Sequence, residues 1–207
     1  MLRIYVTRHG QDEDNAAGLL NGHRDRPLTA LGVKQAHQLA AAIKEHGLVF
    51  DAVYASPLQR ALKTAVIVSQ ESGQPEPIVM DELIERDFGV MTGEKISSVS
   101  ERCAPDVLVS ASGVTYFVNA PQAEDWDDVL TRAHGVLETI REKHADDNAV
   151  LLVAHGDIGK MLYAAFYNLT WEEVVLNFHF GNGDVALLEE GLDKNTAKII
   201  SLRQFNA

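Results

Sequence analysis

Two histidines and two arginines stand where a site for phosphoryl chemistry could form. Arg8 and His9 directly follow one apolar segment, His155 follows a second, and Arg60 comes shortly after a third. The planar fork of an arginine can contact two phosphate oxygens at once. A neutral imidazole nitrogen can attack phosphorus. These residue types together predict a site that binds a multiply charged anion, for which phosphate is the best fit.

The two histidines suit different roles in such a site. Nearby arginines would lower the pKa of one imidazole and keep it unprotonated for attack. The other imidazole, if protonated, would stabilise the phosphoryl oxygens as charge develops in the transition state. The site would still need an acid that protonates the leaving alkoxide.

Alternating strand and helix patterns predict that these side chains meet. The apolar segments 2–7, 52–55 and 149–154 are typical of buried strands, and residues 29–46 and 56–72 have helical patterns between them. This alternation favours an α/β domain with a largely parallel sheet. In such sheets the ligand crevice lies outside the carboxyl ends of the strands, so we expect all four side chains at one edge.

Local signals predict where two helices begin. Ser56 is the expected N-cap of helix 56–72, with Pro57 in its first turn and Gln59 completing a capping box. Asp157 is the expected cap of the helix after the last buried strand.

The remaining elements complete the expected chain path. A short strand is expected at 77–80, and an amphipathic helix at 126–140 carries apolar residues at i, i+3, i+4 and i+7. Two closing strands are expected at 184–190 and 198–205, and 104–122 is expected to cover an edge of the sheet.

Composition and charge exclude several classes of protein. The 30 acidic residues outnumber the 18 basic ones and give a net charge of −12, which argues against a nucleic-acid or anionic-membrane binder. The lone Cys103 excludes an intramolecular disulfide. No signal peptide or membrane-length apolar run is found, so we expect a cytoplasmic protein. His9, Asp12, His23 and Asp25 match no standard metal-ligand spacing, so no metal is expected.

Five blocks of sequence follow one another along nearly the whole chain. They are Arg8-His9-Gly10 with Asn15, 25–32 with Gln35-Ala36, 56–61 with Thr64-Ala65, Leu83-Ile84-Glu85 with Gly89, and Val153-Ala154-His155-Gly156. In content and order this set resembles the histidine phosphatase superfamily, in its phosphoglycerate-mutase-like branch. The resemblance implies a three-layer α/β/α sandwich with a mostly parallel central sheet, a single domain over 1–207, and a helical or loop covering segment at about 94–125.

The resemblance also implies roles for single residues. His9 would be the nucleophile that becomes phosphorylated, without a metal or other cofactor. The residues implied to hold the phosphoryl group or substrate are Arg8, Asn15, Arg60, His155 and Gly156.

Glu85 would be the proton donor to the leaving group and then the base that activates water. Glu82 and Asp87 lie two or three residues away and stay open as alternatives. Surrounding arginines are expected to lower the pKa of this carboxyl group, and a bound phosphate dianion to raise it again.

Three functions remain open at this stage. We expect a phosphomonoester hydrolase that acts on small phosphorylated metabolites, because 94–125 contains only Lys95 and Arg102 as basic residues for a mutase substrate. A phosphoglycerate mutase and a non-catalytic protein that binds a phospho-ligand are the alternatives. The neutral side chains of the covering segment favour a neutral, sugar-like leaving group; these are Ser110, Ser112, Tyr116 and Asn119. A homo-oligomer is left open.

Overall fold

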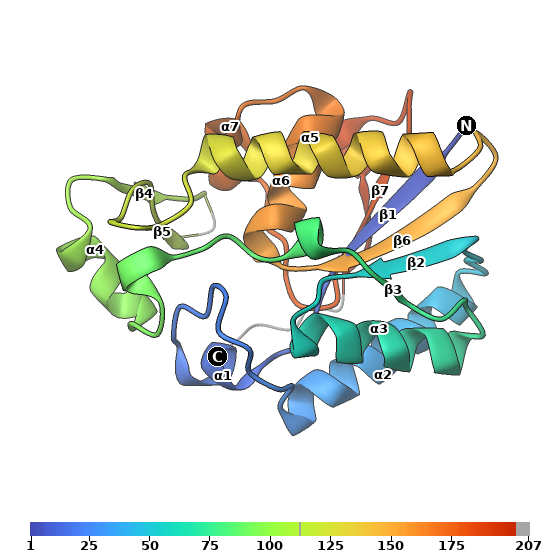
Figure 1. Ribbon diagram of the computed structural model, residues 1–207, viewed down its shortest axis with the longest axis horizontal. Coiled ribbons are helices and arrows are strands. Elements are labelled where there is room, and N and C mark those ends of the chain that lie inside the picture. The colour runs from blue at the N-terminus through green and yellow to red at the C-terminus, as the bar shows by residue number, and fades with distance from the viewer. Residues whose placement is uncertain (112, 202–207) are drawn as a thin grey trace.

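A six-stranded sheet forms the centre of the computed structural model, which describes residues 1–111 and 113–201 (Figure 1). The strand order is β3-β2-β6-β1-β7-β8. The parallel strands are β1 (Arg3–Arg8), β2 (Ala52–Ala55), β3 (Ile78–Val79) and β6 (Ala149–Ala154). The antiparallel strands at one end are β7 (Val185–Leu188) and β8 (Lys198–Ile200). The predicted, mostly parallel sheet is confirmed.

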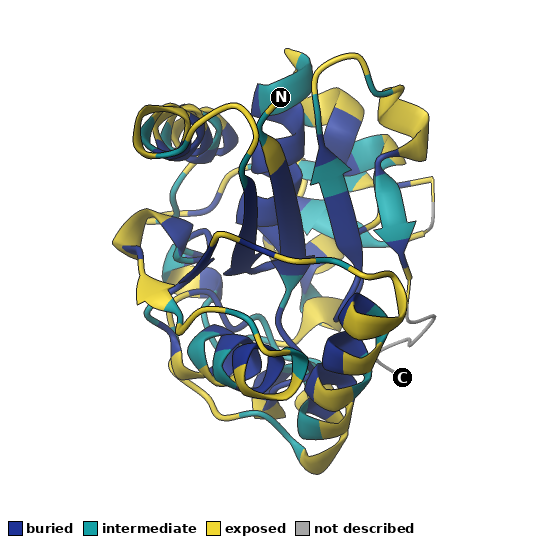
Figure 2. Ribbon diagram, turned by 90° about the vertical axis from the view of Figure 1, so that its right-hand side faces the viewer, coloured by how far each residue is buried: buried dark blue, intermediate teal, exposed yellow. Residues whose placement is uncertain are grey.

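Helices cover both faces of the sheet and give three layers. The pair α2 (Ala30–Glu45) and α3 (Gln59–Ser72) packs on one face, and α5 (Trp126–Lys143), α6 (Gly156–Tyr167) and α7 (Trp171–Asn177) lie on the other (Figure 1). Figure 2 shows the buried central strands between helices whose outer faces are exposed. The predicted α/β/α sandwich is confirmed.

The predicted helical periodicity is most clearly realised in α5. Its apolar side chains are buried along one stripe, and they are Trp126, Val129, Ala133, Val136, Leu137 and Ile140. The Asp125 side chain accepts a hydrogen bond from the Asp128 N–H and caps the first turn. Burial of this stripe fixes α5 over the sheet, because apolar area removed from water stabilises the packing.

The predicted starts of two helices are wrong, and distant carboxylates explain why. Helix α3 begins at Gln59 after Leu58, and Asp25 Oδ1 accepts the Gln59 N–H at 2.7 Å. Helix α6 begins at Gly156, and Glu85 accepts N–H bonds in its first turn. Ser56 is left free of a capping role and contacts His155 instead.

The covering segment contains more regular structure than the sequence predicts. It includes α4 (Val99–Arg102) and a two-stranded sheet of β4 (Val107–Val109) and β5 (Thr115–Phe117). Helix α1 (Glu13–Ala17) lies elsewhere, in the loop after β1. The 3₁₀ turns of the fold are Asp81–Leu83, Gly89–Met91, Ile96–Ser98 and Lys194–Thr196.

Two expectations reach outside the described residues, and one expected strand is shorter in the structure. The strand expected at 198–205 appears as β8 up to Ile200, and residues 202–207 lie outside the described part, as does Ser112. The strand expected at 77–80 is limited to Ile78–Val79. A single domain over 1–207 stays a prediction.

Gly10 lies against the backbone of Gly32 at the start of α2. A Cβ atom at Gly10 would overlap the Gly32 carbonyl oxygen, and a Cβ atom at Gly32 would overlap the Gln11 carbonyl oxygen. This close approach holds the loop after β1 against α2 and so fixes the backbone next to His9.

We expect Gly10→Ala to lower the free energy of unfolding by about 2–3 kcal/mol, because two backbones must separate to admit the methyl group. Gly135→Ala in α5 is the matched control, since a Cβ atom there meets nothing within 4 Å. That control should be neutral or slightly stabilising. Thermal unfolding measures both, and an unchanged Tm in Gly10→Ala would contradict the prediction.

Candidate active site

His9 follows β1 and is held in one tautomer by backbone groups. Its main-chain N–H donates to the Ala154 carbonyl at 3.0 Å, which extends the pairing of β1 with β6. Its Nδ1 lies 2.6 Å from the Gly10 carbonyl oxygen, and a carbonyl only accepts, so Nδ1 carries the proton. In a neutral ring, Nε2 then holds the free lone pair.

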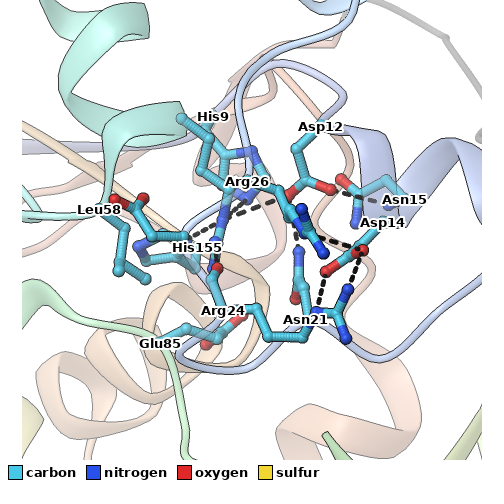
Figure 3. A network of polar contacts seen from close by, with 12 residues as sticks. His9, Asp12, Asp14, Asn15, Asn21, Arg24, Arg26, Leu58, Glu85 and His155 are labelled. Carbon is cyan, nitrogen blue, oxygen red and sulfur yellow. Dashed lines mark hydrogen bonds and ion pairs between the residues drawn. The ribbon is translucent and has the colours of Figure 1, made fainter. Parts of the chain in front are cut away.

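His155 follows β6 and lies beside His9. The ring centroids are 4.9 Å apart (Figure 3). His155 Nε2 donates to Ser56 Oγ at 2.7 Å. The Arg60 Nε–H points at both unprotonated nitrogens, 3.3 Å from His9 Nε2 and 3.2 Å from His155 Nδ1. The two imidazoles therefore face one shared donor.

Burial is the main cause of the low basicity of both histidines. Burial, followed by the charges of Arg60 and Arg8, lowers the pKa of His9 well below its usual value. Burial also lowers the pKa of His155, with Arg60 as the next largest cause. The predicted direction for the nucleophile is correct, but desolvation contributes more than the arginines. Both rings are neutral at neutral pH.

Arg60 lies in the first turn of α3 and is fully buried. Its Nη1 donates to the Arg24 carbonyl at 2.6 Å and its Nη2 to the Gly22 carbonyl at 2.8 Å. These bonds tie α3 to the loop between α1 and α2. The guanidinium plane is fixed as a result.

A cavity of about 310 Å³ opens beside these groups at the carboxyl ends of the parallel strands. Arg8 lines it from the end of β1, with Nη1 donating to the Phe180 carbonyl at 3.1 Å. The other lining residues on this side are Asn15, Asn21, Glu85, Gly156 and Asn182. His9, with 1% of its surface exposed, lies just behind this wall.

Glu85 is buried at the N-terminus of α6. Its carboxylate accepts main-chain N–H bonds from Arg86 at 3.0 Å, Asp157 at 3.1 Å and Ile158 at 3.1 Å. Burial, followed by the charge of Asp157, raises its pKa, although the N–H bonds oppose the rise. The expected lowering by arginines is wrong, because desolvation and a second carboxylate dominate. A raised pKa suits a proton donor.

The two alternative acids lie elsewhere. Glu82 is exposed, and it does not line the cavity. Asp87 also stays out of the cavity wall, its side chain is 45% exposed, and its Oδ1 accepts the Gly89 N–H at 2.9 Å. Geometry therefore favours Glu85 for the acid.

The sequence from residue 4 to residue 202 matches the histidine phosphatase superfamily (branch 1). The chain belongs to this superfamily. The resemblance drawn from the five sequence blocks is therefore confirmed, and with it the assignment of the chain to a family of phosphatases and mutases.

Individual relatives span both activities. A 2,3-bisphosphoglycerate-dependent phosphoglycerate mutase of Methylobacterium sp. (strain 4-46) is 32% identical over 176 residues, which cover 83% of each chain. The structure of Bacillus stearothermophilus YhfR matches with a TM-score of 0.76 and 26% identity over 91% of each chain. A mycobacterial glucosyl-3-phosphoglycerate phosphatase in complex with VO3 matches with a TM-score of 0.74 and 26% identity, over 90% of this chain and 92% of that one.

The structure brings the predicted site residues of this histidine phosphatase together. His9, Arg60 and His155 are in mutual contact. Arg8, Asn15, Glu85 and Gly156 line the adjoining cavity. A Cβ atom on Gly156 would lie 3.6 Å from both Arg8 Cζ and Glu85 Oε2, so the position of Gly156 is adjacent to both groups.

Several polar residues of the site were missed from the sequence. Asp12 forms an ion pair with Arg60 and accepts a hydrogen bond from Asn21. Asn182 Nδ2 donates to the His9 carbonyl at 2.6 Å. The far wall of the cavity adds Arg86, Asp157, Lys160 and His179, together with Tyr116, which was expected there as a neutral hydrogen-bonding side chain. Asp157 and Lys160 could have been found, because they lie three residues apart on the helix that follows His155. Asn182 precedes an antiparallel strand and gives no comparable signal.

Two absences hold for the described part of the chain. Within residues 1–111 and 113–201, no three His, Cys, Asp or Glu side chains cluster in a way that could hold a metal ion. None of the helices described there combines the length and apolarity needed to cross a membrane.

Proposed function

We propose that this histidine phosphatase is a phosphomonoester hydrolase that works through a phosphohistidine at His9. The observation that carries the proposal is the tautomer of His9. The Nδ1–H is bound to the Gly10 carbonyl, and the free lone pair of Nε2 faces the positive charge of Arg60. Such a nitrogen is a neutral nucleophile, and it needs no base to activate it.

The first step transfers the phosphoryl group to His9. Nε2 forms a bond to phosphorus while the bond from phosphorus to the leaving oxygen breaks. Arg8 and Arg60 stabilise the charge on the phosphoryl oxygens. Glu85 gives its proton to the leaving alkoxide, for which its raised pKa is suited. The negative charge of the phosphoryl group also raises the proton affinity of His155, which can then donate to it.

The second step returns the phosphoryl group to water. The Glu85 carboxylate accepts a proton from a water molecule. The oxygen of that water attacks phosphorus, and the bond between phosphorus and Nε2 breaks. His9 recovers its lone pair and Glu85 its proton. The cycle is balanced without a metal ion.

Hydrolysis is favoured over mutase activity by the covering segment. Its two basic residues, Lys95 and Arg102, do not line the cavity, and Arg102 forms an ion pair with Glu94. A mutase must retain its leaving group for the return transfer, and this segment offers no cation for that purpose.

The far wall of the cavity favours an acidic leaving group over the neutral sugar expected from the sequence. Asp157 lies between Lys160, at 3.4 Å, and Arg86, at 3.6 Å, so the trio carries one net positive charge. Among the described residues, Arg86 Nε and Nη1 have no hydrogen-bond partner although they are buried. Buried donors that form no hydrogen bond favour an anionic acceptor on the ligand, and of the two only Nε has a carboxylate nearby, that of Asp157. Names of relatives, such as phosphoglycerate mutase and glucosyl-3-phosphoglycerate phosphatase, support this class.

One experiment tests the proposal. The protein is incubated in excess chelator with 3-phosphoglycerate, with glycerol phosphate and with an aryl phosphate. We expect phosphate release from all three, with kcat/KM at least about tenfold higher for 3-phosphoglycerate than for glycerol phosphate. Isomerisation of 3-phosphoglycerate without release would favour the mutase. No reaction with any ester would leave a protein that only binds a phospho-ligand.

Other expectations for the protein stay predictions. They are the cytoplasmic location, the lack of nucleic-acid binding and the open question of a homo-oligomer.

A further inference from the structure

Asp12 is a fully buried carboxylate inside the candidate site, in the loop that follows β1. Its Oδ1 accepts the Asn15 N–H at 2.7 Å and caps α1, and its Oδ2 accepts from Asn21 Nδ2 at 2.6 Å (Figure 3). Oδ2 also lies 3.3 Å from Arg60 Nε. Two N–H donors hydrogen-bond the carboxylate and the Arg60 guanidinium lies at ion-pair distance from it. Burial raises the pKa of Asp12, and these three groups oppose the rise by favouring the ionised form.

Asp12 and the nucleophile lie equally close to one charged nitrogen of Arg60. Arg60 Nε lies 3.3 Å from Asp12 Oδ2 and 3.3 Å from His9 Nε2. A phosphoryl group at His9 would therefore lie within a few ångströms of a buried negative charge, where repulsion is weakly screened. Asn21 lines the cavity, and its Nδ2 donates to Asp12. An incoming phosphate could otherwise accept that hydrogen bond.

We propose that Asp12 is a counter-charge of the phosphoryl site, which positions Arg60 and Asn21 and limits how tightly the site retains phosphate. The proposal rests on the proposed function, in which free phosphate is a product. Arg8 and Arg60 alone would hold that product strongly, and a fixed carboxylate favours its release.

The contrast with Asp14 shows that the pairing of Asp12 is particular to the site. Asp14 is another buried carboxylate on α1, but it pairs with Arg24 Nε at 2.9 Å and lies 3.8 Å from Arg26 Nε (Figure 3). The two loop arginines thus neutralise the charge of Asp14, away from His9.

The test is the affinity for inorganic phosphate, measured by titration calorimetry on the full chain. Asp12→Ser removes the charge and keeps a residue that can cap α1. We expect the Kd for phosphate to fall about tenfold, and the inhibition constant of phosphate in the hydrolase assay to fall in parallel. Asp14→Asn is the matched control and should change this Kd less than about twofold. Asp12→Asn makes the same comparison where Asp12→Ser does not fold.

The outcomes separate this proposal from the proposed function. An unchanged or higher Kd in a folded Asp12 variant would overturn the counter-charge, because a purely structural role predicts no gain in phosphate affinity. Tighter phosphate binding together with no turnover of any ester would support the counter-charge and count against the hydrolase. If neither the natural chain nor the Asp12 variants bind phosphate, the counter-charge is wrong.

Discussion

Replacing His9 by alanine should lower kcat on an aryl phosphate by about 10⁴-fold or more, the scale expected when a nucleophile is removed. The natural protein should form a phosphoenzyme that is labile in acid and stable in base, as a bond between phosphorus and nitrogen is. His9→Ala should form none. Quenching the reaction with labelled substrate and counting the protein-bound label measures both.

Two further variants make this result specific. His9→Asn keeps a planar polar side chain in the buried position and should be as inactive as His9→Ala, which excludes a packing defect as the cause. His134→Ala changes an exposed histidine on α5 and should leave kcat unchanged. A His9 variant that keeps more than a tenth of the natural kcat would show that another group receives the phosphoryl group.

The layer architecture could be predicted because local sequence patterns determine it. The run 149–154 is apolar throughout and becomes β6, buried on both faces, while the periodic stripe from Trp126 onward becomes the inner face of α5. These patterns reflect burial alone, which acts on each segment separately. The place of Arg8 and His155 at one sheet edge then follows from parallel pairing, and β1 and β6 pair with Arg8 opposite Ala154.

What the sequence could not supply are contacts between distant segments. Ser56 has the type of an N-cap, but Asp25, 34 residues from Gln59, provides the acceptor. Glu85 similarly accepts N–H bonds in the first turn of α6, 72 residues away. Its raised pKa results from that burial, whereas the motif alone suggested arginines as neighbours. Tertiary pairing overrides a local signal wherever it satisfies the same donor.

The same limit applied to charge. The net charge of −12 excludes a broad basic surface, but it says nothing of a cavity with Arg8 at one wall and Arg86 and Lys160 at another. Nor does it reveal that Asp12 pairs with Arg60, or that Asp157 lies between Arg86 and Lys160. Residue counts average over space, while an active site depends on which few charges share one buried volume.

Replacing Glu85 by glutamine should distinguish substrates by their leaving groups. We expect kcat/KM for an alkyl phosphate to fall about 10²–10³-fold, because the alkoxide then leaves without a proton. The fall for an aryl phosphate should be less than about tenfold, since a phenolate leaves unaided. The ratio kcat/KM is the right measure, because it reports formation of the phosphohistidine and not the later attack of water.

The pH dependence gives the same variant a second readout. Burial raises the pKa of Glu85, so the carboxyl group stays protonated to a higher pH than an ordinary glutamate. For the natural protein, kcat/KM on the alkyl ester should persist above the usual carboxyl range and fall as Glu85 loses its proton. In Glu85→Gln that falling limb should be absent, because the amide does not titrate.

Glu82→Gln is the matched control, an exposed carboxylate three residues away, and Asp87→Asn removes the other alternative acid. Both should change kcat/KM less than about twofold on either ester, since neither side chain lines the cavity. An equal loss on alkyl and aryl phosphates in Glu85→Gln would mean that Glu85 supports α6 rather than the leaving group. A loss in Asp87→Asn that is selective for the alkyl ester would show that Asp87 is the proton donor. The proton would then reach the leaving group from the exposed side of the loop.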